Sequence, residues 1–272
     1  MKKQETLQDV DFAQLYRNHF QLASRQPKTA QDWDEKAAKM QHSDFDLHNQ
    51  YVQHFVRRMT LSGCESLLDV GCGGGAICLA IAPHFKQVYG LDYSEGMLSL
   101  LQQRAEKLGL THIQPLCKSW EENWDDVPEC DICVSSRSSM VADLDEAIDK
   151  LNAKAKKAVY MTMLVEREFI AREILQYIGR DNVGFPNYMY ALNLLHQKGY
   201  YASVDFIETG CGLLPPEKQD EASFIQCVQW SIGELSAEEV EKLKTYYATH
   251  PDLISARPTR QRWAFLSWKK EQ

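Results

Sequence analysis

The sequence lacks any uncharged apolar run of the roughly 20 residues that are needed to cross a bilayer. Its first residues, MKKQETLQDVDF, carry two lysines with no apolar segment behind them, which is not the pattern of a signal peptide. It also has no internal repeat, no low-complexity tract and no linker rich in proline, glycine or serine. These absences predict a cytoplasmic protein with no membrane partner.

Positive charge is also in short supply. The chain has 30 lysines and arginines against 38 aspartates and glutamates, a formal net charge of −8. A large nucleic-acid surface needs clustered basic side chains to neutralise phosphates, and the longest basic cluster here is only Lys154–Lys157. Nucleic acid is therefore not expected as a partner.

Cysteine is too sparse for a disulfide scaffold, with eight in 272 residues. Several lie in apolar, strand-like segments, which is typical of small buried side chains in a reducing compartment. Cys130 and Cys133 have the spacing of half a zinc site. On a strand, however, residues three apart face opposite sides, and no second such pair follows, so we expect no metal.

The pattern of apolar residues divides the chain into two parts. Residues 1–62 are polar with helical spacing and predict two to four helices that form an N-terminal cap, or lid. Residues 63–272 alternate short apolar runs with helices, which predicts a parallel sheet covered on both faces, with a helical insertion at about 210–258. The expected strands are Ser66–Val70, Gln87–Leu91, Ile113–Cys117, Asp131–Ser135, Ala158–Leu164, Tyr201–Ile207 and Trp263–Trp268. The expected helices include Ser94–Leu108, Leu144–Asn152, Asn187–Lys198 and two within 217–250, the second capped by Ser236 and Glu239.

A glycine cluster follows the first expected strand in the segment LLDVGCGGG. A sharp strand-to-helix turn needs residues that tolerate unusual backbone angles, and a ligand approaches the backbone most closely where Cβ is absent. Gly71 and Gly73 meet both demands. The start of the next helix offers free N–H groups and a positive dipole end to an anionic group.

Asp92 sharpens this signal, because it ends the second expected strand 21 residues beyond Gly71. A carboxylate at this position accepts hydrogen bonds from the ribose hydroxyls of an adenosine ligand. The spacing Gly71-x-Gly73-x-x-Ala76 also fits a loose dinucleotide fingerprint, so NAD is an alternative. Against NAD, Asp69 stands where dinucleotide sites usually keep an apolar residue, and a long helical segment precedes the first strand.

The segments LLDVGCGGG and VYGLDYSEGML resemble the first two motifs of class I S-adenosylmethionine-dependent methyltransferases, especially the branch of ubiquinone and menaquinone biosynthesis enzymes. The resemblance covers roughly residues 62–165 and continues weakly at the C-terminal strands. It implies a Rossmann-like α/β fold with helices on both faces of a seven-stranded sheet. The implied strand order is 3-2-1-4-5-7-6, with the last strand antiparallel. The implied cofactor is S-adenosyl-L-methionine, and the product is S-adenosyl-L-homocysteine.

The resemblance also assigns residues to parts of the cofactor. It places Asp69, Gly71, Cys72 and Gly73 at the methionine part, Asp92 at the ribose, and Tyr93 and Met97 beside the adenine. Ser119 and Trp120 follow the third strand; an acidic adenine contact is absent from this Ser-Trp pair, but Trp120 can form an apolar wall. Ser135, which ends the fourth strand, falls where the backbone meets the methionine amine.

Substrate contacts are less defined by the sequence. Trp33 and Tyr51 are aromatic residues of the expected cap and suit either a core or an acceptor site. Arg137 follows the fourth strand at the mouth of the site, where its guanidinium suits a carboxylate or phosphate of the acceptor. The alternative for Arg137 is a surface ion pair with Asp143 or Asp145.

Methyl transfer needs positioning and exclusion of water more than a catalytic triad, so no catalytic residue is assigned. The leading hypothesis is a methyltransferase acting on a small molecule. A methyltransferase acting on RNA or protein, and a non-catalytic protein that binds S-adenosylmethionine, are the alternatives.

Overall fold

A seven-stranded sheet organises the molecule. The computed structural model describes residues 6–23, 27–41, 45–180, 183–210, 219–253, 255–258 and 260–270. The strand order is β3-β2-β1-β4-β5-β7-β6, in which β7 runs antiparallel to both of its neighbours, and the expected topology is confirmed. The strands are β1 (Ser66–Val70), β2 (Gln87–Asp92), β3 (Ile113–Cys117), β4 (Cys130–Ser136), β5 (Ala155–Leu164), β6 (Ser203–Gly210) and β7 (Arg260–Lys269).

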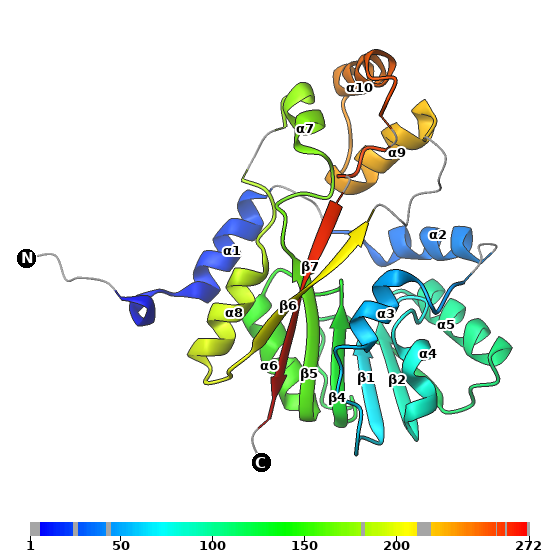
Figure 1. Cartoon of the computed structure of the whole chain (residues 1–272), viewed down its shortest axis with the longest axis vertical. Coiled ribbons are helices and arrows are strands. Elements are labelled where there is room, and N and C mark those ends of the chain that lie inside the picture. The colour runs from blue at the N-terminus through cyan, green and yellow to red at the C-terminus, as the bar shows by residue number, and fades with distance from the viewer. Residues whose placement is uncertain are drawn as a thin grey trace, which may run out of the picture.

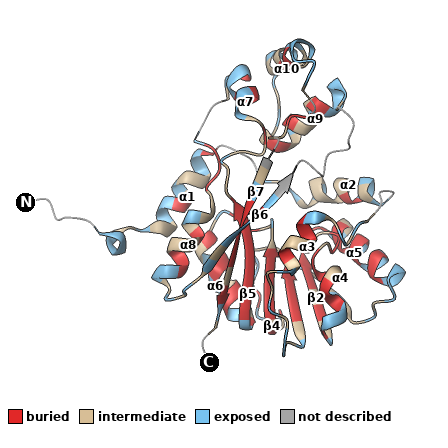
Figure 2. Ribbon diagram, in the orientation of Figure 1, coloured by how far each residue is buried: buried red, intermediate tan, exposed pale blue. Residues whose placement is uncertain are grey.

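The central strands are buried on both faces, as their apolar sequences require. Leu67 and Ile132 belong to one core cluster, while Leu68 and Cys133 belong to a second, so adjacent residues of β1 and β4 point to opposite faces. Figure 2 shows the continuous burial of these strands beneath more exposed helices. Cys130 and Cys133 on β4 are both fully buried.

Helices cover the two faces and the upper edge of the sheet. The elements next to the sheet are α3 (Gln50–Val56), α4 (Cys78–Ile81), α5 (Glu95–Lys107), α6 (Leu144–Lys154) and α8 (Tyr188–Gln197), with the short 3-10 helix η2 (Ala82–His84). The N-terminal segment adds η1 (Leu7–Asp9), α1 (Phe12–Leu22) and α2 (Ala30–Met40). Side chains of Asp11, Thr29 and Asn49 cap α1, α2 and α3, so each helix begins where its sequence supplies an acceptor.

A separate helical unit stands above the carboxyl ends of the parallel strands (Figure 1). It consists of α7 (Arg172–Ile178), α9 (Glu221–Ile232) and α10 (Ala237–Thr249), whose apolar side chains share a third core cluster. The capping box of Ser236 and Glu239 at the start of α10 is confirmed. The expected insertion did not include α7, which precedes β6 in the chain. Residues 211–218, at the start of that insertion, lie outside the described residues.

The boundary expected at residue 62 does not separate two cores. Tyr51 and Phe55 of α3 are 2% and 0% exposed and belong to the same core cluster as Leu67 and Phe265 of the sheet. Tyr16 of α1 packs into the core on the opposite face. The N-terminal helices are therefore packed onto the sheet, and α3 belongs to its core.

Among the described residues, no helix is both long and apolar enough to span a membrane.

Candidate functional site

The glycine turn between β1 and α4 has two different sides. Gly71 and Gly73 have φ angles of 68° and 52°, in the left-handed region that favours glycine. A Cβ on Gly71 would overlap the side chain of Ser138, which fills that side and donates a hydrogen bond to Val70 O at 2.7 Å. A Cβ on Gly73 would meet only the sulfur of Met97, at 3.9 Å. The side chain of Ser138 thus packs against the turn at Gly71, whereas the space beside Gly73 is open.

Asp92 ties the end of β2 to this turn. One of its carboxylate oxygens accepts a hydrogen bond from Gly73 N at 2.8 Å, and the other accepts from Ser94 N at 3.0 Å. The side chain is 7% exposed, and burial raises its pKa. Each oxygen retains a lone pair, since a carboxylate accepts about four hydrogen bonds in all.

Asp69 lies deeper, at 1% exposure, and accepts a hydrogen bond from Cys78 N at the start of α4 at 3.2 Å. Burial raises the pKa of Asp69 to about 7, and the nearby Asp92 acts in the same direction. Cys72 is also buried, and burial raises the pKa of its thiol well above the usual value. The carboxyl groups of Asp69 and Asp92 therefore lie close to the turn with little access to solvent, and this arrangement favours a cationic group nearby.

Helix α2 covers the side of the site expected to hold adenine. Asp34 Oδ1 accepts hydrogen bonds from Ser94 Oγ at 2.6 Å and from Gly96 N at 2.8 Å, and so supplements the N-cap of α5. Met97 is 3% exposed and packs with side chains of α2. The Tyr93 hydroxyl donates to Lys28 O at 2.8 Å. Asp34 had no signal in the sequence, because nothing in its spacing links it to α5.

The loop after β3 reaches the same turn from the other side. The Trp120 indole N–H donates to Ser138 O at 3.1 Å, beside Gly71 in the fold, and its ring lies 5.2 Å from that of Trp124. Ser119 N donates to Glu122 Oε2 at 2.5 Å. Trp120 thus packs between Trp124 and the loop that carries Ser138.

Arg137 follows β4 and is the one non-glycine residue with a positive φ, 57°, among the described residues. Its backbone N–H donates to Thr162 Oγ1 at 3.0 Å, which holds this strained position in place. Its guanidinium carbon lies 4.0 Å from the ring centroid of Tyr51, whose hydroxyl bonds to Ser136 and Thr162 at 2.8 Å each. Ser135 is fully buried and bonds to Ser138.

The alternative expected for Arg137, an ion pair with Asp143 or Asp145, is wrong. Asp143 pairs with Arg17 at 3.0 Å, and Asp145 pairs with Lys198 at 2.9 Å. Within the described part of the chain, Arg137 has no carboxylate partner within ion-pair distance. The exposed guanidinium of Arg137 is thus held on the ring of Tyr51 at the end of β4, and its N–H groups make no ion pair with the described carboxylates.

The two expected aromatic substrate contacts have different surroundings. Tyr51 is buried under Arg137, so its hydroxyl is occupied within the protein, and burial raises its pKa. Trp33 lies on α2, and its ring meets that of Trp230 on α9 at 5.5 Å in an edge-to-face contact. Lys36 lies over both rings, at 4.6 and 4.8 Å. Trp33 therefore links the N-terminal helices to the helical unit above the sheet.

Arg104 is a site residue that the sequence analysis missed. It is 7% exposed on α5, donates from Nη1 to Gly74 O at 2.8 Å, and stacks on the ring of Phe45 with its guanidinium carbon 3.8 Å from the centroid. A Cβ on Gly74 would overlap this guanidinium. At Gly74, the guanidinium of an arginine from another helix thus occupies the space that a side chain would enter.

Comparisons with known proteins bear on the same segment. A family model described as a methyltransferase domain matches residues 67–158, which include the glycine turn and Asp92. An uncharacterized protein of Haemophilus influenzae is 38% identical over 270 residues, covering 98% of this chain and 99% of its own. The ubiquinone biosynthesis O-methyltransferase of Coxiella burnetii is 35% identical over 105 residues, which are 38% of this chain and 43% of that enzyme.

Solved structures share the fold at low sequence identity. Magnesium protoporphyrin IX methyltransferase from Synechocystis, with bound S-adenosylhomocysteine, is 13% identical with a TM-score of 0.54, and the match covers 96% of this chain and 100% of that one. Phosphoethanolamine N-methyltransferase 2 from Haemonchus contortus is 16% identical with a TM-score of 0.54, covering 100% of this chain and 62% of that one.

Proposed function

We propose an acceptor class and a set of binding residues for this chain, which belongs to the class I S-adenosylmethionine-dependent methyltransferases. Its cofactor is S-adenosyl-L-methionine. The acceptor that we propose is a small molecule that carries an anionic group. The observation that carries this proposal is the exposed guanidinium of Arg137, fixed on Tyr51 at the end of β4 and without a carboxylate partner among the described residues.

The residues around the glycine turn fit this cofactor. The open space beside Gly73 gives a ligand access to the backbone, and Asp92 retains lone pairs for two ribose hydroxyls. Buried Asp69 would supply negative charge toward the methionine amine, with the backbone of Cys72 in the turn and that of Ser135 near the end of the neighbouring strand β4. Tyr93, Met97 and Trp120 would enclose the adenine, with Ser119 at the edge of that wall.

The cofactor supplies an activated methyl group on a sulfonium, which is already a good leaving group. The protein has to hold the acceptor in line with that carbon and keep water away. Helix α2 is docked onto α5 by Asp34 and contacts α9 through Trp33. We propose that α1 and α2 serve as the cover that excludes water, while α3 belongs to the core beneath.

Arg137 would hold the acceptor rather than react with it. The planar guanidinium presents paired N–H donors suited to a carboxylate or phosphate. Its position after β4 places it beside the glycine turn after β1, because β1 and β4 are neighbours in the sheet. Since the chain is acidic overall, this local cation gives an anionic acceptor a specific place to bind.

The proposed function is tested by formation of S-adenosylhomocysteine from S-adenosylmethionine in a metabolite extract. We expect turnover that survives ribonuclease and protease treatment of the extract and is lost when an anion-exchange resin has removed its acidic metabolites. Turnover that disappears with ribonuclease or protease would indicate a macromolecular acceptor. Cofactor binding without any turnover would indicate a protein that binds the cofactor but does not use it.

A further inference from the structure

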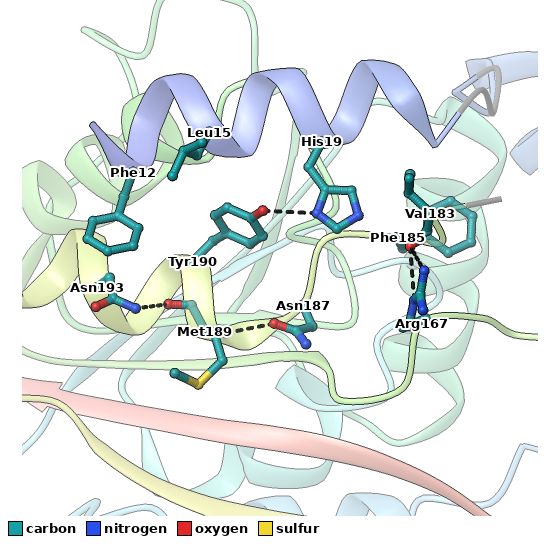
Figure 3. Close-up of a pocket in the computed structure, with 10 residues that line it drawn as sticks. All are labelled: Phe12, Leu15, His19, Arg167, Val183, Phe185, Asn187, Met189, Tyr190 and Asn193. Atoms are coloured by element: carbon teal, nitrogen blue, oxygen red, sulfur yellow. Dashed lines mark hydrogen bonds between the residues drawn. The ribbon is translucent and has the colours of Figure 1, made fainter. Parts of the chain in front are cut away.

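A groove with a volume of about 560 Å³ lies between α1 and α8 and is lined by residues that have not been assigned to the cofactor or acceptor site so far. This volume is in the range of small-molecule sites. Figure 3 shows Phe12, Leu15 and His19 of α1 facing Tyr190 and Asn193 of α8 across it. The walls are mainly aromatic and aliphatic, with a few polar groups between them.

The rim of this groove is unusually apolar for a surface. Leu15 and Met189 are each 44% exposed, and Val183 is 39% exposed; all three line the groove. Exposed apolar side chains scattered singly need no explanation, but a group of them around one concavity indicates a ligand site. No aspartate or glutamate is among the ten lining residues, and the one charged residue among them is Arg167.

The polar groups of the groove are held in fixed orientations. Gly184 O can only accept, so His19 Nε2 donates to it at 3.1 Å, which leaves Nδ1 to accept from the Tyr190 hydroxyl at 2.9 Å. Asn187 Oδ1 accepts from Met189 N, and Asn193 Nδ2 donates to Met189 O. One amide NH₂ and one amide oxygen therefore have no hydrogen-bond partner among the described residues.

The sheet order places the groove on the acceptor side of the site. Asp92 ends β2, the glycine turn follows β1, Arg137 follows β4, and Arg167 of the groove follows β5, in the spatial order β2-β1-β4-β5. Arg137 thus lies between the proposed cofactor site and the groove. Helix α1 joins them, because the hydroxyl of Tyr16 donates to Val141 O in the loop after Arg137.

Aromatic contacts also connect the two places. Phe185 of the groove lies 5.5 Å from the ring of Phe169, which lies 6.2 Å from Trp263. Trp263 lies 6.4 Å from Tyr51, the ring beneath Arg137. A series of ring contacts within the core therefore connects the wall of the groove to Tyr51, the ring beneath Arg137.

We infer that this groove holds the apolar body of the methyl acceptor, whose anionic end pairs with Arg137. The inference rests on the proposed function and narrows the acceptor to amphiphilic molecules with an aromatic or aliphatic body. The amide groups of Asn187 and Asn193 would form hydrogen bonds with neutral polar atoms along that body.

The direct probe is 8-anilino-1-naphthalenesulfonate, an aromatic anion whose fluorescence rises in an apolar environment. We expect saturable binding to the full-length protein, weakened about tenfold or more in Leu15→Glu and in Met189→Glu, since each places a carboxylate beside the apolar ligand. Leu22→Glu is the matched control, because Leu22 lies on α1 like Leu15, is 62% exposed and is not among the residues that line the groove. The dye affinity of this variant should equal that of the wild-type protein. Thermal unfolding of all three variants verifies that they fold.

A second readout ties the groove to the acceptor. Turnover in metabolite extract should fall at least about fivefold in both groove variants and stay unchanged in Leu22→Glu, while the dissociation constant for S-adenosylmethionine stays the same in all. Folded groove variants with normal dye affinity, or with normal turnover, would overturn the inference. If wild-type protein binds the dye at the groove but forms no S-adenosylhomocysteine, the proposed function fails instead.

Discussion

On the β1–β2 side of the sheet edge, most of the proposed cofactor residues come from one short stretch, residues 69–97, and only Ser119, Trp120 and Ser135 come from later in the chain. On the β4–β5 side they come from residues far apart in the chain: Tyr51, Arg137, Thr162 and the walls of the α1–α8 groove. Under the proposed function, the first side would bind the cofactor that such methyltransferases share, so a local motif is enough to form it. The second side would bind one particular acceptor, and contacts between distant parts of the chain form it.

The largest effect should come from closing the glycine turn. We expect Gly73→Val to abolish measurable binding of S-adenosylmethionine, because the side chain would enter the space that is open beside this residue. Isothermal calorimetry measures the loss. Gly109→Val is the matched control, because Gly109 has a similar φ, 68°, with no atom within 4 Å of its hypothetical Cβ. Equal loss of binding in both variants would mean that backbone strain, and not a blocked site, is responsible.

The second effect concerns the ribose contact. Asp92→Ala should weaken S-adenosylmethionine binding at least about tenfold, since hydrogen bonds to a charged group contribute roughly 1.5–3 kcal/mol each. It also removes the acceptor that Gly73 N uses. Asp126→Ala, at an exposed carboxylate whose partner is Lys118, serves as the control. An unchanged dissociation constant in Asp92→Ala would remove this residue from the site.

Binding should also depend on pH through Asp69, whose pKa burial raises to about 7. A carboxyl group with a raised pKa is neutral below that value, so its attraction for the methionine amine is gained as pH rises through 7. We expect affinity roughly tenfold higher at pH 8 than at pH 6. Calorimetry across this range should give a flatter profile for Asp69→Asn. An identical slope in both proteins would assign the dependence to another group.

On the β4–β5 side, Arg137→Ala should raise the Michaelis constant for the acceptor about tenfold and leave cofactor affinity unchanged. Steady-state kinetics with the acceptor found in the extract tests this. The control is Arg17→Ala, because Arg17 lies near the same loop with its charge paired to Asp143. Lower thermal stability of Arg137→Ala with normal kinetics would show that the guanidinium only packs on Tyr51.

The smallest effect should come from a substitution in α2, the helix that we propose as part of the cover over the cofactor. Asp34→Ala removes two hydrogen bonds from the start of α5 and loosens α2 above Met97. We expect roughly three- to tenfold weaker cofactor binding. The comparison variant is Asp32→Ala, which affects the cap of α2 itself but not its bonds to α5. If both variants behave alike, α2 acts through its own stability and not through its contact with α5.

The strands and the topology could be predicted because each strand is a short apolar run with clear boundaries. β1 and β3 have the expected bounds, and β4, β5 and β7 extend the expected runs by one or more residues at their ends. The expected start of β6 at Tyr201 was two residues early. The unit formed by α7, α9 and α10 could not be predicted, because its core joins residues on both sides of β6.

The site divides in the same way. The motif predicted Asp69, the glycine turn and Asp92 as cofactor residues, since local spacing defines them. It could not identify Ser138, Arg104 or Asp34, which reach the turn and α5 from other elements. Arg137 and Tyr51 were each predicted as acceptor residues, but their contact with each other was not, because only the fold brings α3 over β4 and β5.

Parallel calorimetric titrations of the full-length protein with S-adenosylmethionine, S-adenosylhomocysteine and NAD test the account most directly. We predict saturable one-site binding of the first two ligands and no binding of NAD, because the proposed site at the glycine turn and Asp92 would hold an adenosine linked to a small amino acid. Saturable binding of NAD without binding of S-adenosylmethionine would contradict it.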